Sequence, residues 1–132
     1  AATLGHKFGV TTTFRNRIAV RELHAAYRAV EGAYGGTLVT NMSVLEMDAD
    51  PEQAKARILE LAREAVERDH IEVIILGCAG LSGYAADIER ELGVVVLDPS
   101  AVGLKTAEMV ASLGLKHSKV ARFQKPRPKL IK

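Results

Sequence analysis

The 132-residue chain has one cysteine, no tryptophan and few other aromatic residues. A single thiol excludes an internal disulfide and leaves no second sulfur for a zinc site. No apolar run approaches the ~20 residues of a membrane span, and the first residues lack the basic head and apolar segment of a signal peptide. We therefore expect no membrane partner and a reducing, cytoplasmic location. The histidines are scattered without metal-ligand spacing, so no metal site is expected: His6, His24, His70 and His117.

Charge is unevenly distributed along the chain. Residues 114–132 carry seven Lys or Arg and no acid, whereas residues 1–113 carry 11 basic and 16 acidic residues. A basic arm of this kind is one form of nucleic-acid-binding segment. This one offers a single aromatic residue, Phe123, for base stacking. We therefore expect no nucleic-acid partner, and instead a tail that docks on another lobe or subunit.

Strand-like and helix-like patterns alternate along the first 113 residues. Four runs rich in β-branched residues are expected to be strands: 7–13, 37–40, 72–76 and 94–97. Four segments have helical periodicity: 16–31, 50–69, 82–92 and 101–113. Such alternation predicts a three-layer α/β fold with a four-stranded parallel sheet, in the order 2-1-3-4, and helices on both faces.

Two of the expected helices carry detailed signals. The first has apolar residues spaced three, four and three apart, which predicts a buried face formed by Val20, Leu23, Tyr27 and Val30. Gly32, Gly35 and Gly36 are expected to end it. The second begins with Asp50 as an N-cap followed by a proline. Its apolar side is expected to be Ala54, Ile58, Leu61, Ala62 and Ala65.

The predicted strand order also predicts where a ligand would bind. In open α/β sheets, ligands bind beyond the carboxyl ends of the strands, where the strand order reverses. Here that point lies between the first and third strands. The residues expected at these ends are Thr11, Thr12 and Thr13 on one side, Gly77 and Cys78 on the other, and Asp98 and Pro99 on the same rim.

Cys78 precedes the helix expected at 82–92, and a cysteine at a helix N-terminus holds more thiolate at neutral pH. Gly77 and Gly80 would let a ligand approach backbone N–H groups that can hold a carboxylate or an enolate oxygen. Plainer interpretations stay open. Cys78 could be an inert buried cysteine. The threonines could be strand formers, with Thr13 capping the next helix, and Asp98 could be only an N-cap.

Several stretches resemble the hydantoin and allantoin racemase branch of the aspartate/glutamate racemase superfamily. They are V-I-I-L-G-C-A-G-L, G-V-V-V-L-D-P-S-A-V-G-L-K and S-L-G-L-K-H-S-K, with K-F-G-V-T-T-T at the start and F-Q-K-P-R-P-K near the end. The resemblance covers nearly all of the chain and corresponds to the second lobe of a two-lobed fold. It implies that residues 1–113 form this lobe and that residues 114–132 dock on a first lobe, which is absent from this chain.

The resemblance also implies a reaction. One cysteine from each lobe would exchange a proton at a carbon next to a carbonyl, in a hydantoin or allantoin ring, without a cofactor. The residues matching the family pattern are Cys78 as the catalytic thiol, Gly77, Ala79, Gly80 and Leu81 as a substrate-binding loop, and Thr12 and Thr13 as pocket wall. The second catalytic residue would lie outside this chain, in a protein expected to form homo-oligomers.

Two other functions fit the same residues. A single thiol can protonate one face of an enolate, as in an arylmalonate decarboxylase-like or maleate isomerase-like enzyme of the same superfamily. A binding module that kept the fold and lost the chemistry would also retain the cysteine.

Overall fold

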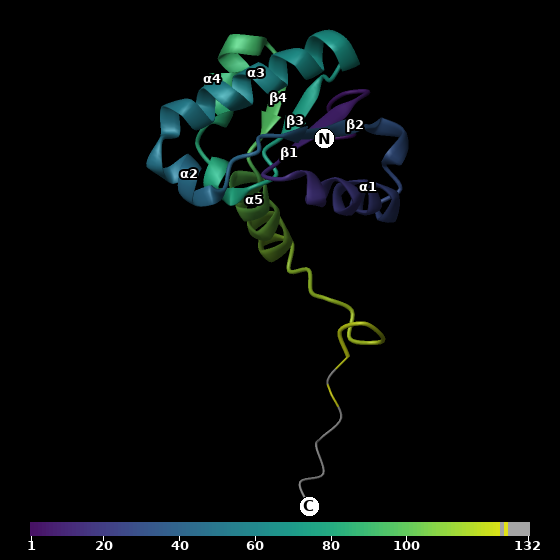
Figure 1. Ribbon diagram of the computed structural model, residues 1–132. Coiled ribbons are helices and arrows are strands. Elements are labelled where there is room, and N and C mark those ends of the chain that lie inside the picture. Colours follow the sequence, from purple (N-terminus) through teal and green to yellow (C-terminus); the bar gives the residue numbers. More distant parts are fainter. Residues whose placement is uncertain (125, 127–132) are drawn as a thin grey trace, which may run out of the picture. The chain divides into compact units, whose positions relative to one another are not determined.

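The computed structural model describes residues 1–124 and 126 (Figure 1). Four parallel strands form one sheet in the order β2-β1-β3-β4, as predicted. The strands are β1 (Phe8–Thr12), β2 (Tyr34–Val39), β3 (Val73–Ile75) and β4 (Val95–Leu97). The basic tail predicted from the sequence is described only in part, because Lys125, Arg127, Lys129 and Lys132 lie outside the described residues.

Five α-helices accompany the sheet in the described part of the chain: α1 (Ile18–Tyr27), α2 (Val44–Ala49), α3 (Pro51–Asp69), α4 (Ala85–Leu92) and α5 (Pro99–Ser112). Three 3₁₀ turns lie between them: η1 (Arg15–Arg17), η2 (Glu31–Ala33) and η3 (Ala79–Leu81). Helices α3 and α4 lie on one face of the sheet and α1 on the other (Figure 1). By its internal contacts the chain divides into two units, Ala1–Val102 and Gly103–Lys132.

The main core lies between the sheet and the α3 and α4 helices. Asp50 caps α3 by accepting a hydrogen bond from the Gln53 N–H at 3.0 Å, as the Asp-Pro signal predicted. The predicted apolar side of α3 is confirmed at four fully or nearly fully buried positions: Ala54, Ile58, Ala62 and Ala65. The opposite face of the sheet has a smaller cluster of buried residues in the described part, formed by Phe8, Val10 and Val73.

The buried face predicted for the first helix is wrong. Leu23 is 63% exposed and Tyr27 83% exposed, whereas Ala25 is buried. The side of α1 that meets the sheet carries Arg21 and Ala25, four residues apart. This side is offset by one residue, or about 100° around the helix axis, from the apolar stripe that includes Val20, Leu23 and Tyr27. The Arg21 side chain donates a hydrogen bond to the carbonyl of Gly77, just beyond β3, which fits this orientation of the helix.

Two further elements differ from the sequence prediction. Strand β2 begins at Tyr34, so Gly35 and Gly36 lie in a strand and do not end a helix. A Cβ on Gly35 would lie 2.2 Å from Ile71 Cδ1, so a larger residue here would require this buried side chain to shift. Helix α2 was not predicted. Its signal was present as a capping box, in which Ser43 and Glu46 bond each other's backbone N–H groups.

The contrast between Ile58 and Tyr27 gives a test of this packing. Ile58→Ala should lower the free energy of unfolding by about 2–5 kcal/mol, because it leaves a cavity in the main core. Tyr27→Ala should change it by less than about 0.5 kcal/mol, because the ring is exposed. Urea denaturation followed by circular dichroism measures both. A loss for Tyr27→Ala as large as that for Ile58→Ala would contradict the observed rotation of α1.

Candidate active site

The end of β3 lies directly against the end of β1. The Gly77 N–H donates a hydrogen bond to Thr11 Oγ1 at 2.9 Å, and Thr11 is completely buried. A Cβ on Gly77 would lie 2.0 Å from the Thr11 carbonyl oxygen. Glycine is therefore required here for the two strand ends to approach this closely. The prediction that these two ends meet at the reversal of strand order is confirmed.

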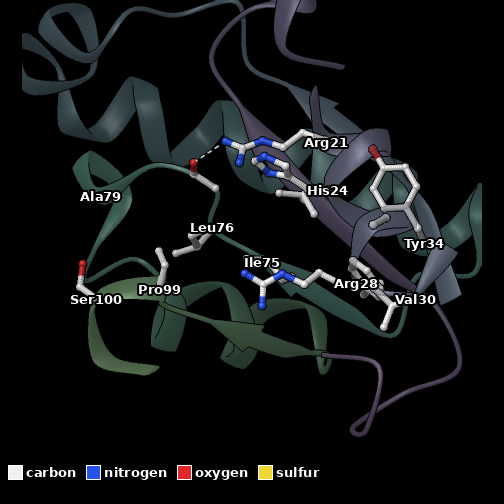
Figure 2. A pocket seen from close by; sticks show the side chains of 14 residues that line it. Arg21, His24, Arg28, Val30, Tyr34, Ile75, Leu76, Ala79, Pro99 and Ser100 are labelled. Carbon is white, nitrogen blue, oxygen red and sulfur yellow. Dashed lines mark hydrogen bonds between the residues drawn. The ribbon is translucent and has the colours of Figure 1, made fainter. Parts of the chain in front are cut away.

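Arg21 holds the other backbone group of Gly77. Its Nη2 donates a hydrogen bond to the Gly77 carbonyl oxygen at 2.8 Å (Figure 2). Its Nε is buried and has no hydrogen-bond partner among the described residues. Sequence reasoning missed Arg21 because it assigned the neighbouring apolar stripe of the helix to the interior. A basic residue one helical turn before the small Ala25 was the available signal.

Cys78 follows in an extended conformation, with φ −138° and ψ 134°, and is half-buried. The next three residues form only the η3 turn, and α4 does not begin until Ala85. The helix expected from residue 82 therefore starts later than predicted, after Gly83 at φ +98°. Because a three-residue 3₁₀ turn is not a helix N-terminus, the thiolate argument from a helix dipole does not apply to Cys78.

The loop that carries Cys78 contains backbone N–H groups without a hydrogen-bond partner among the described residues. In the described part of the chain, the N–H groups of Cys78, Ala79 and Gly80 make no hydrogen bond. A Cβ on Gly80 would lie 3.7 Å from the Cys78 Sγ, so the thiol packs against the Cα of Gly80. Leu81 has a different place: its side chain is fully buried in the main core and its N–H donates to the Cys78 carbonyl at 3.0 Å. The buried Leu81 side chain thus anchors the loop to the main core.

The predicted threonines lie at the end of β1. Thr12 is almost fully buried, and its carbonyl accepts hydrogen bonds from the Thr40 N–H at 2.9 Å and the Thr40 hydroxyl at 3.2 Å. Thr13 is half-buried, and its carbonyl accepts from the Asn41 N–H at 2.8 Å. Thr13 does not cap the following helix, since neither η1 nor α1 has a side-chain cap. Thr40 is a buried polar residue of this edge that sequence reasoning missed.

Asp98 ties the far end of the Cys78 loop to the start of α5. One carboxylate oxygen accepts hydrogen bonds from the Ser82 hydroxyl at 3.2 Å and the Ser100 N–H at 2.7 Å, and the other accepts from the Gly83 N–H at 3.1 Å. Burial alone would raise the pKa of Asp98. The N–H groups of Ser100, Gly83 and Ala101 and the Ser82 hydroxyl outweigh it, so the pKa is lowered. Asp98 is therefore an N-cap that also holds the loop.

A hollow of about 570 Å³ opens on the α1 side of these strand ends (Figure 2). Gly77, Ala79 and Pro99 line it, but Cys78 does not. Its other walls combine apolar sheet residues with the basic side chains of His24 on α1 and of Arg28 directly after it.

The described residues contain no cluster of three or more metal-ligating side chains, and none of their helices is long and apolar enough to cross a bilayer.

The role of Asp98 gives a pH-dependent prediction. Asp98→Ala should lower the free energy of unfolding by about 0.5–2 kcal/mol at pH 7, because the cap is lost. Since the folded-state pKa of Asp98 is lowered, this stabilisation is present above the unfolded pKa of ~3.9 and is lost as pH falls through the folded value. Urea denaturation at pH 7 and pH 3 should show the difference shrinking.

The matched control for that experiment is Asp48→Ala, at an exposed position near the end of α2. It should leave stability nearly unchanged at both pH values. A wild-type advantage over Asp98→Ala that is the same at pH 7 and pH 3 would contradict the assigned role of the carboxylate.

Comparison with known proteins shows which family the chain belongs to. Residues 1–107 match the family described as Asp/Glu/Hydantoin racemase. The chain is 35% identical over 130 residues to a hydantoin racemase of Pseudomonas sp. strain NS671, covering 98% of this chain and 52% of that protein. It is 39% identical over 89 residues to the hydantoin racemase of Paenarthrobacter aurescens, covering 67% of this chain and 38% of that protein.

Solved structures agree. The allantoin racemase from Pseudomonas fluorescens superposes with a TM-score of 0.90 at 32% identity, over 98% of this chain and 55% of that one. The allantoin racemase from Klebsiella pneumoniae shares the fold, with a TM-score of 0.92 at 23% identity, over 100% of this chain and 54% of that one. The chain thus spans about half the length of these relatives. The resemblance seen in the sequence is confirmed, and the chain belongs to the Asp/Glu/hydantoin racemase family.

Proposed function

We propose that this chain is the Cys78-bearing half of a cofactor-independent racemase that acts on a hydantoin or allantoin ring. The observation that carries the proposal is a half-buried thiol just after β3, on a loop whose N–H groups at Cys78, Ala79 and Gly80 make no hydrogen bond in the described part of the chain. Family membership and the names of the similar proteins supply the substrate class.

The proposed reaction is a proton exchange at a carbon next to a carbonyl. The Cys78 thiolate takes the proton from this carbon, and the electron pair of the C–H bond moves onto the carbonyl oxygen to form an enolate. A second thiol on the opposite face then gives its proton to the same carbon. Cys78 ends as the thiol and the second cysteine as the thiolate, so the reverse turnover uses the same two groups with their roles exchanged.

Backbone N–H groups beside Cys78 suit the developing oxyanion. The donors of Cys78, Ala79 and Gly80 would stabilise negative charge on the carbonyl oxygen more in the transition state than in the substrate. Thr12 and Thr13 would form the neighbouring wall. The proposed reaction needs no cofactor, because the adjacent carbonyl accepts the negative charge that forms when the proton is removed.

We propose that the other half of the protein supplies the second thiol. Proton transfer on two faces needs two groups, and this chain has one cysteine while spanning about half the length of its relatives. Helix α5 has no buried residue, and Leu104, Met109 and Leu113 are each more than half exposed. We propose this apolar surface and the basic segment 114–132 as parts that contact the other half. A cytoplasmic location and homo-oligomeric assembly also remain predictions.

Replacing the thiol tests the proposal in the whole protein. Cys78→Ala should reduce racemisation of a chiral hydantoin or of allantoin by about 10²- to 10⁴-fold, because a general base is lost. Polarimetry gives the rate, and circular dichroism shows that the variant is folded. Tyr84→Phe, which removes a hydroxyl from a half-buried residue near the loop, should keep the wild-type rate. Undiminished racemisation by Cys78→Ala would overturn the assignment.

Deuterium exchange separates racemisation from one-thiol chemistry. In deuterated water, a two-base racemase should exchange the α-proton of both enantiomers of the substrate, because each thiol works on one face. NMR of the α-proton follows both reactions. No exchange with either enantiomer, together with decarboxylation of a malonate or isomerisation of maleate, would favour the other chemistry of the superfamily. Loss of all turnover by the folded whole protein would favour a binding module.

A further inference from the structure

Both backbone groups of Gly77 are held by side chains from other elements. On the β1 side, Thr11 Oγ1 accepts a hydrogen bond from the Gly77 N–H at 2.9 Å. On the α1 side, Arg21 Nη2 donates a hydrogen bond to the Gly77 carbonyl at 2.8 Å. These partners lie 66 and 56 residues away along the chain. Long-range side chains therefore determine the orientation of the residue before Cys78.

Gly77 also has no room to move. A Cβ there would meet the Thr11 carbonyl oxygen at 2.0 Å, Val10 Cγ1 at 3.0 Å and Arg21 Nη2 at 3.2 Å. The close contact with the Thr11 carbonyl and the hydrogen bonds to Thr11 and Arg21 together restrict the conformation of this backbone. The peptide that joins Gly77 to Cys78 starts from that fixed point.

The position of the Arg21 side chain is unfavourable in free energy. Its Nε is buried without a partner in the described part of the chain, and an unpaired buried donor is unfavourable. His24 and Arg28 line the same hollow, and their side chains form no hydrogen bond or ion pair with a described residue. His24 lies on α1 and Arg28 directly follows it, and both are exposed, whereas Arg21 is half-buried. Of these three side chains, that of Arg21 bonds to Gly77.

We propose that Arg21 is a positioning residue for Cys78, an inference that rests on the function proposed above for that thiol. The Gly77 carbonyl and the Cys78 N–H belong to the same peptide group. A guanidinium on the carbonyl oxygen holds the plane of that peptide and polarises it, which makes the Cys78 N–H a stronger donor. Arg21 therefore sets both the direction of the thiol-bearing residue and the strength of an N–H that would hold the enolate oxygen.

Three variants separate this role from general packing. Arg21→Met keeps the apolar stem of the side chain and removes the donors. Arg21→Lys restores one donor and the charge. Arg28→Met is the control, because it removes a cation that lines the same hollow, directly after α1, without a bond to the loop.

The first measurement is amide hydrogen exchange in the whole protein, which requires no activity. Arg21→Met should speed exchange of the Gly77 amide, and of the loop after it, by roughly ten-fold, because the loop opens more readily. Arg21→Lys should restore most of the protection, and Arg28→Met should match the wild type. Unchanged exchange in Arg21→Met, or an equal change in Arg28→Met, would overturn the inference about Arg21.

The second measurement is racemisation by the whole protein. Arg21→Met should lower kcat by about ten-fold or more, with a smaller change in KM, because a hydrogen bond that acts on the oxyanion donor is lost. Arg21→Lys should recover most of kcat. An unchanged kcat in a folded Arg21→Met variant would overturn the positioning role. Absence of racemisation by the wild-type whole protein would instead contradict the function proposed for Cys78, and the exchange result would still decide the role of Arg21.

Discussion

The close approach of Gly77 to Thr11 is the contact on which the site depends. It is possible because a glycine stands where any Cβ would collide with the Thr11 carbonyl oxygen. The β1–β3 pairing ends just before this point, at Val10 and Ile75, and the hydrogen bond from Gly77 to the Thr11 hydroxyl extends the contact between the two strand ends. Cys78 therefore lies at the point where the strand order reverses, which is where open α/β sheets bind their ligands.

Side chains from other elements hold the loop that carries Cys78, and no helix N-terminus directly follows the thiol. Arg21 and Thr11 hold its beginning through Gly77, and Asp98 holds its end through Ser82 and Gly83. Leu81 fixes the middle from the main core. With the loop anchored at three places, the backbone N–H groups of Cys78, Ala79 and Gly80 need no partner within the loop to keep its conformation. That arrangement leaves them available for an anionic oxygen.

The two faces of the sheet are covered unequally, and this has a consequence for the whole protein. The α3 and α4 side has a deep core, whereas the other side has a small cluster and a hollow of about 570 Å³. Helix α5, taken by itself, buries none of its residues. A lobe with this much uncovered apolar surface is consistent with a chain that spans about half the length of its relatives.

Local patterns predicted much of the fold. Runs of β-branched residues marked the four strands, Asp50 with Pro51 marked the start of α3, and alternation led to the correct strand order. Several stretches, among them G-C-A-G, carried the resemblance to the family that the comparisons show. The strands and the start of α3 could be predicted because neighbouring residues along the chain decide them. The capping box of Ser43 and Glu46 was equally local and was overlooked.

Tertiary structure decided the rest, because it depends on contacts between residues far apart in the sequence. Periodicity shows which residues of a helix are apolar, but the structure shows that Arg21, which bonds to Gly77, is on the side of α1 that meets the sheet. Likewise Gly35 lies in the strand that pairs with β1, and the Ile71 side chain occupies the space of a Cβ there. The sequence alone determined that a thiol would stand at the end of the third strand. Only the packing of β1, α1 and the Asp98 loop determined how that thiol is held.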